Sequence, residues 1–130
     1  MIVDVFGCFR SSSTGGKSYQ ADTTPNQRLS TTLTQASAAI NVGVAGGAGA
    51  VALTVANVTS NNAIGHLYAW PRGLSVPATS NINLMAGDHI SNLMVTPTRR
   101  YSGADYFSID RNSNTTGSTT VQIVQLGYFS

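Results

Sequence analysis

The sequence predicts an all-β protein, most simply an antiparallel β-sandwich of about eight to ten short strands, with a small β-barrel as the alternative. Short runs in which apolar and polar residues alternate recur along the chain, as expected of strands with one buried face. Gly, Asn and Ser residues, which suit turns, separate these runs. The chain has no Glu and one Lys, so it lacks the residues that cover helix surfaces, while its 42% hydrophobic content argues against disorder.

The expected strands are Ile2–Phe9, Arg28–Thr34, Ala38–Val44, Ala50–Val58, Gly65–Trp70, Ser80–Leu84, His89–Val95, Asp105–Asp110 and Thr119–Phe129. The first and last are apolar runs that end in Gly, one further residue and Phe. The alternation is clearest in the fourth, where bulky Val51, Leu53 and Val55 are separated by smaller residues. Turns are expected at Ser11–Gly16, Gly46–Gly49, Ser60–Asn62, Ala86–Asp88 and Arg111–Gly117.

The length of 130 residues is that of one domain, so residues 1–130 are interpreted as a single β domain. Residues 10–27 are linker-like, because they contain few apolar residues. The opening run Val3–Phe9 echoes the closing run Ile123–Phe129. Residues 1–9 are therefore expected to form a terminal strand that is added to this domain or exchanged with a neighbour.

The charges exclude some partners. The formal net charge is +2, and the basic residues are scattered apart from Arg99 and Arg100, so no nucleic acid is expected as a partner. The uncharged stretch from Ala38 to Val58 is diluted by Gly, Asn and Thr, so no membrane span is expected either.

No enzyme motif is present. The chain offers five Asp and two isolated His residues, and it has no nucleophile elbow, zinc-protease motif or phosphate-binding loop. We therefore expect no catalytic residues, no metal site and no cofactor.

One aromatic run has two interpretations. Strand alternation places His66, Tyr68 and Trp70 on one face and Leu67 and Ala69 on the other. We expect the aromatic face to form core, and keep sugar stacking by exposed rings as the alternative. In that alternative the glycan contacts are Tyr68, Trp70, Arg72, Asn81 and Asn83. The simpler role for the two Asn side chains is hydrogen bonding to nearby loop backbone.

The order of segments in the middle of the chain resembles a known group of modules. Ala50–Val58 is followed by Gly65–Gly73 and Pro77–Leu84, and then by Ala86-Gly-Asp and Asn92-Leu. This order resembles the β-rich accessory modules of secreted actinobacterial hydrolases and surface proteins, with their "LNVTV", "GFLTVYPAG", "PTASNLNF", "AGQTVANL" and "DVVGYF" segments. The resemblance covers about residues 38–129 and implies a non-catalytic β module.

The match has limits at both ends. Pro25, Arg28 and Leu29 stand where the modules show "TPTRLLDTR", but the Asp and second Arg of that motif are absent. Val124 replaces the Asp of the closing segment. The opening run resembles the last strand of a preceding repeat.

The start of the chain has Asp4 in place of the positive region of a secretory signal. We therefore expect a phage virion version of such a module, built in the host cytoplasm as a capsid decoration or tail-associated protein. Its partners would be itself, a capsid or tail protein, and a host cell-surface glycan. Attachment would use strand edges and termini, with Ile2, Val3, Val5, Phe6 and Phe9 as contacts. The alternative is a glycan- or cell-wall-binding accessory module of a secreted bacterial protein, located outside the cell or on its surface.

Overall fold

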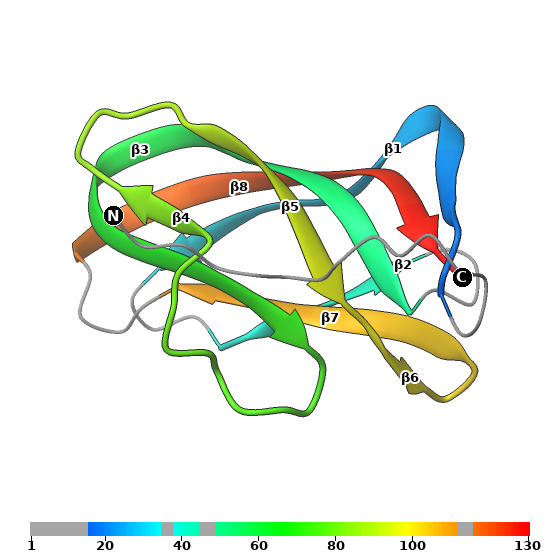
Figure 1. Cartoon of the computed structure of the whole chain (residues 1–130). Helices are drawn as coiled ribbons and strands as arrows, with labels where there is room; N and C mark the ends of the chain where they lie inside the picture. Colours follow the sequence, from blue (N-terminus) through cyan, green and yellow to red (C-terminus); the bar gives the residue numbers. More distant parts are fainter. Residues whose placement is uncertain (1–15, 35–37, 45–48, 112–115) are drawn as a thin grey trace.

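The computed structural model describes residues 16–34, 38–44, 49–111 and 116–130. The described chain forms eight strands: β1 (Tyr19–Thr34), β2 (Ile40–Val44), β3 (Ala50–Pro71), β4 (Ile82–Leu84), β5 (Ser91–Pro97), β6 (Arg99–Tyr101), β7 (Ala104–Arg111) and β8 (Thr116–Phe129). Two antiparallel sheets pack together (Figure 1), which confirms the predicted all-β sandwich. No helix among the described residues is long and apolar enough to cross a membrane.

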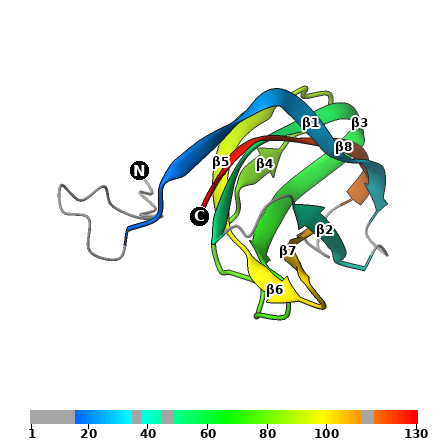
Figure 2. The same cartoon turned by 90° about the vertical axis from the view of Figure 1, so that its right-hand side faces the viewer.

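Sheet A has the strand order β5-β3-β8-β1 and contains the first half of β3. Sheet B has the order β4-β3-β7-β2 and contains the second half of β3, with β6 paired to the start of β7. Figure 2 shows β1, β8, β3 and β5 arching over β2, β7 and β6. The short β6 was not expected from the sequence. It forms a hairpin with β7 through Ser102 and Gly103, both of which have positive φ.

The longest strand, β3, passes through both sheets. The turn expected at Ser60–Asn62 does not form, because this backbone continues to pair with β8 through Ser60↔Thr119 and Asn61↔Ser118. Register irregularities after Asn57 and after Asn61 mark the passage between the sheets. Gly65, just beyond them, has a φ of 145°, a value that favours glycine. Polar residues that resemble a turn in sequence therefore serve here as bulges that bend a continuous strand.

The strand β1 is longer than expected. Residues Tyr19–Gln27, which fall in the segment interpreted as linker-like, form its first half and pair with the end of β8, with Tyr19 opposite Phe129 and Asn26 opposite Gln125. A register shift between Ala21 and Asn26 accommodates the polar residues and Pro25. Strand pairing thus occurs here without the alternation of apolar and polar residues by which a strand is recognised in a sequence.

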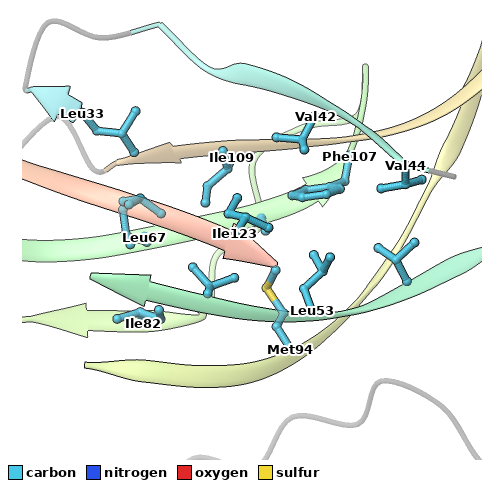
Figure 3. Packing of buried hydrophobic residues seen from close by; sticks show 14 of the residues in the cluster. Leu33, Val42, Val44, Leu53, Leu67, Ile82, Met94, Phe107, Ile109 and Ile123 are labelled. Carbon is cyan, nitrogen blue, oxygen red and sulfur yellow. The ribbon is translucent and has the colours of Figure 1, made fainter. Parts of the chain in front are cut away.

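The core lies between the two sheets and draws on every strand except β6 (Figure 3). Its largest member is Phe107 of β7, which packs among aliphatic side chains of both sheets. The buried set is Leu33, Val42, Val44, Val51, Leu53, Val55, Leu67, Ala69, Ile82, Leu84, Met94, Phe107, Ile109, Val121 and Ile123. Burying these apolar side chains is the main driving force for joining the sheets.

A buried arginine closes one end of the sandwich. Arg111 is the last residue of β7, and its Nη1 donates to the carbonyl oxygens of Gly117 at 2.6 Å and Leu33 at 3.4 Å. Burial lowers the pKa of this guanidinium from its ordinary value. Arg111 therefore links the ends of β1, β7 and β8, where the sequence predicted the start of a loop.

Candidate functional site

The aromatic residues of β3 lie on the outer face of sheet B. Leu67 and Ala69 belong to the core, so alternation turns His66, Tyr68 and Trp70 away from it. Of the residues expected to form core, Trp70 is buried, but His66 and Tyr68 are only half-buried and none of the three belongs to the cluster between the sheets. The smaller aliphatic residues fit between the sheets, and the rings occupy the opposite surface.

Trp70 is covered from outside. Its indole Nε1 donates to the carbonyl oxygen of Leu74 at 3.0 Å, and the residue is 6% exposed. The segment that follows β3 thus folds back over the ring. Trp70 offers no open face to a sugar in this conformation.

The two asparagines proposed as glycan contacts have different surroundings. The Asn81 side-chain oxygen accepts the Ala69 backbone N–H at 2.6 Å, and the Asn81 N–H donates to the Leu67 carbonyl at 2.9 Å. Asn81 therefore extends the pairing of β4 with β3, and it bonds to strand backbone where loop backbone was expected. Asn83 is exposed, and its Oδ1 lies 2.9 Å from His66 Nδ1 and accepts the Ser80 hydroxyl at 2.8 Å.

Arg72 lies between two tyrosines at the corner where β3 ends and the β6–β7 hairpin begins. Its Cζ is 3.7 Å from the centroid of the Tyr101 ring and 5.0 Å from that of Tyr106. Arg99 is paired with Tyr106 in the β6–β7 register, so it lies on the same face. Arg72, Arg99, Tyr101 and Tyr106 are called the arginine–tyrosine strip below.

The geometry of the strip depends on two glycines. Tyr106 lies against Gly43 of β2, where an added Cβ would come 3.4 Å from its Cε1 atom. Gly73 has a φ of 76°, and a Cβ there would come 3.4 Å from Arg99 Nη1. Glycine thus lets the backbone approach both the ring and the guanidinium.

Of the strip, only Arg72 was among the site residues predicted from the sequence, and Arg99, Tyr101 and Tyr106 were not. The signal for the others was the Ser102-Gly103 pair, which marks a tight hairpin. A hairpin at this pair puts Arg99, Tyr101 and Tyr106 on one face of the sheet.

A salt bridge borders the strip. Arg100 Nη1 lies 3.4 Å from Asp105 Oδ2, and Arg100 Nη2 donates to the Gly103 carbonyl at 3.0 Å. Asp105 is buried on the core side of β7, so its carboxylate faces away from the outer surface. Its negative charge neutralises Arg100.

The second candidate surface is the outer edge of β5, from Leu93 to Pro97, called the β5 edge below. Within the described residues β5 pairs with β3 alone. This edge carries no charge, and Leu93 is 72% exposed. An uncharged edge with an exposed apolar side chain is a surface to which another strand can pair.

The opposite edge of sheet A is protected. β1 contains Pro25 and two register shifts. Its Arg28 Nε donates to the buried Gln125 side-chain oxygen at 3.0 Å, and Gln125 Nε2 donates to Asp22 at 2.9 Å. Proline, bulges and inward-pointing charges are the features that prevent a strand edge from pairing with other chains.

The contacts proposed for assembly, Ile2, Val3, Val5, Phe6 and Phe9, lie outside the described residues. Among the residues that are described, no three His, Cys, Asp or Glu side chains come together in a group that could hold a metal ion.

Comparisons of the chain with family models, curated proteins and solved structures find no match. The two surfaces are therefore interpreted from their own chemistry.

Proposed function

We propose that this chain is a non-enzymatic structural protein of a phage particle, a capsid decoration or tail-associated protein that assembles through its strand edges and termini. The observation that carries the proposal is the β5 edge. Among the described residues β5 pairs on one side only, with β3, and it carries an apolar side chain exposed to solvent. The resemblance of residues 38–129 to modules of extracellular surface proteins supports the particle setting.

The other edges are less suited to pairing. β1 is bulged, β4 and β6 have three residues each, and β2 has five. β5 has seven residues and pairs in unbroken register with Ala50–Ala56. Apart from Pro97 at its end, which lacks an N–H group, this regular strand can accept a partner along its length, whereas a bulged or very short strand cannot.

The partner that fits this edge is the segment Ile2–Phe9 of a second copy. It contains five large apolar residues and one charge, at Asp4, and it has about the length of β5. Such an added strand would gain affinity from main-chain hydrogen bonds and register from its side chains. Because donor and acceptor surfaces differ, each copy would donate to the next in a head-to-tail chain or ring.

The first test removes the donor segment. Deletion of residues 1–9 is expected to convert the assembled protein to monomer, as measured by light scattering coupled to size-exclusion chromatography. An unchanged mass, with particle attachment also unchanged, would refute the exchange of this segment between copies.

The second test changes the acceptor. Leu93→Lys places a positive charge on the β5 edge and is expected to give monomer without unfolding, because the Leu93 side chain is exposed. Leu74→Lys is the matched control, since Leu74 is 55% exposed in the segment after β3 and lies outside sheet A. If both variants keep the mass of the parent protein, the β5 edge is not the contact.

The particle setting has its own test. Mass spectrometry of purified particles of the phage that encodes this chain is expected to recover its peptides in a fixed ratio to the major capsid or tail protein. Recovery only from the culture medium, within a larger secreted bacterial polypeptide, would instead support an accessory module of that protein.

A further inference from the structure

We infer that the arginine–tyrosine strip binds an anionic saccharide, a sugar that carries a carboxylate or a phosphate group. The strip lies on the outer face of sheet B, whereas the β5 edge belongs to sheet A. Arg99 follows Pro97, the end of that edge, by two residues, so the two sites adjoin and are separated by experiment below.

Two guanidinium groups of the strip are available to a ligand. Within the described residues, Arg72 and Arg99 donate no side-chain hydrogen bond and pair with no carboxylate, whereas Arg100 is already paired with Asp105. Their N–H groups can bind a carboxylate or phosphate in a bidentate manner. This corner thus has positive charge that no described carboxylate neutralises.

Stacking prepares Arg72 for such a contact. Its Cζ atom lies 3.7 Å from the centroid of the Tyr101 ring, a contact that restricts the side chain. A guanidinium fixed before binding loses less conformational entropy when it forms paired hydrogen bonds. Lysine would keep the charge here but would lose both the planar fork and the stacking.

The surroundings of the arginines fit a sugar. Tyr101 is 57% exposed and presents an aromatic surface with a hydroxyl group. Tyr106 lies on Gly43, and the exposed Asn41 is on the same face of β2. Asn41 Oδ1 accepts the Ser108 hydroxyl at 2.8 Å, which leaves its amide N–H groups for a sugar hydroxyl.

The distribution of charge disfavours nucleic acid as the ligand. Outside this corner, Arg28 bonds to Gln125 and Arg111 is buried. A polynucleotide requires a row of basic residues that follows successive phosphates, and the described surface has one compact corner instead. A single anionic group on a sugar matches the charge of that corner.

The test is an NMR titration of the full-length, ¹⁵N-labelled protein. The probes are tri-galacturonate, glucose 6-phosphate, a neutral tri-galactoside, inorganic phosphate and a short single-stranded DNA. The arginine Nε–Hε signals of Arg72 and Arg99 and the backbone signals of Tyr101 and Tyr106 report on the strip. We expect tri-galacturonate, glucose 6-phosphate or both to shift these signals, and the comparison of the two identifies carboxylate or phosphate as the anionic group.

Three variants separate a shaped site from general charge attraction. Arg72→Lys preserves the net charge and is expected to weaken binding of the active probe about tenfold or more, because a bidentate charged contact is lost. Tyr101→Ala is expected to weaken binding as well, because it removes the ring that holds Arg72 in place. Lys17→Gln removes an exposed charge outside the strip and is expected to change affinity little.

Several results would overturn the inference. These are no shift with either charged sugar, equal binding of the neutral tri-galactoside, the same shifts with inorganic phosphate (an adventitious ion only), and tighter binding of DNA. Loss of affinity in Lys17→Gln equal to that in Arg72→Lys would reduce the effect to overall charge. Light scattering of Arg72→Lys separates the two proposals, since its assembled mass is expected to match that of the parent protein.

Discussion

Asn57 is a buried polar residue at the point where β3 leaves sheet A. It is 2% exposed, its Nδ2 donates to the Asp88 carbonyl at 2.8 Å, and its Oδ1 accepts the Thr119 hydroxyl. Its backbone N–H also donates to the Ile90 carbonyl at 2.7 Å. One side chain thus joins the turn before β5 to β8, on either side of β3.

Asn57→Leu is therefore expected to destabilise the protein although leucine is apolar. The Asp88 carbonyl and the Thr119 hydroxyl would each lose a buried partner, which should lower the free energy of unfolding by about 2–3 kcal/mol. Urea denaturation measures this change. Asn26→Leu, at an exposed position of β1, serves as control and should stay within about 0.5 kcal/mol of the parent. Equal stability of both variants would contradict the role assigned to Asn57.

Sequence patterns grouped residues correctly but did not always identify their surroundings. Alternation placed His66, Tyr68 and Trp70 on one face, as in the structure, but the size of the rings suggested core when the core accepted Leu67 and Ala69. Asn81 bonds to backbone as expected, whereas Asn83 bonds to the side chains of His66 and Ser80. The burial of Trp70 depends on a loop that folds back over it, and such a tertiary contact leaves no periodic signal in the sequence.

At the level of elements, the pairing of β1 with β8 depends on Gly127. A Cβ at this position would overlap the Gln20 carbonyl oxygen and the Tyr19 ring. The Tyr19 side chain crosses the strand here, donates its hydroxyl to the Leu126 carbonyl at 3.2 Å, and contacts Phe129 with ring centroids 5.2 Å apart. Gly127, in the closing run Ile123–Phe129, therefore leaves room for Tyr19 of the neighbouring strand.

Gly127→Ala is expected to release the first residues of β1 and to lower the free energy of unfolding by about 1–3 kcal/mol, as overpacking does. Near-ultraviolet circular dichroism should report the lost Tyr19–Phe129 contact, and thermal unfolding should report the stability. Gly16→Ala is the matched control, because a Cβ there meets no atom within 4 Å. Retention of the tyrosine signal in Gly127→Ala would show that the strand can shift to make room.

Some elements could be predicted from sequence because one face of each is buried. Val51, Leu53 and Val55 alternate strictly, and the strand that contains them begins at the predicted residue, Ala50, although it continues past the predicted end at Val58 to Pro71. The first half of β1 and the middle of β3 could not be predicted, because polar and bulged backbone pairs there without an apolar pattern. The strip escaped prediction for a related reason, since its residues come from β3, β6 and β7 and meet only in three dimensions.

At the level of the whole molecule, β3 belongs to both sheets, pairing with β5 and β8 in one and with β4 and β7 in the other. Side chains from both of its halves lie in the same core. If β3 left either sheet, the core face of the other sheet would be exposed to water. The two sheets should therefore unfold together.

Native-state hydrogen exchange tests this cooperativity. The amides of Leu53 and Val55 in sheet A and of Leu67 in sheet B are expected to exchange with the same free energy, equal to that of global unfolding. A clearly lower value for Leu67 would mean that sheet B opens by itself, contrary to the shared-strand argument.

The described chain begins and ends at the same place, where Ser18 and Ser130 exchange two backbone hydrogen bonds of 3.1 Å each. β1 and β8 run antiparallel from this point. Tension applied at residues 18 and 130 would therefore load the β1–β8 hydrogen bonds one pair at a time. It would separate β1 from β8 starting at Tyr19. Anchoring the molecule through the β5 edge instead would spread the same force over many hydrogen bonds in shear, so its mechanical strength depends on where it is held.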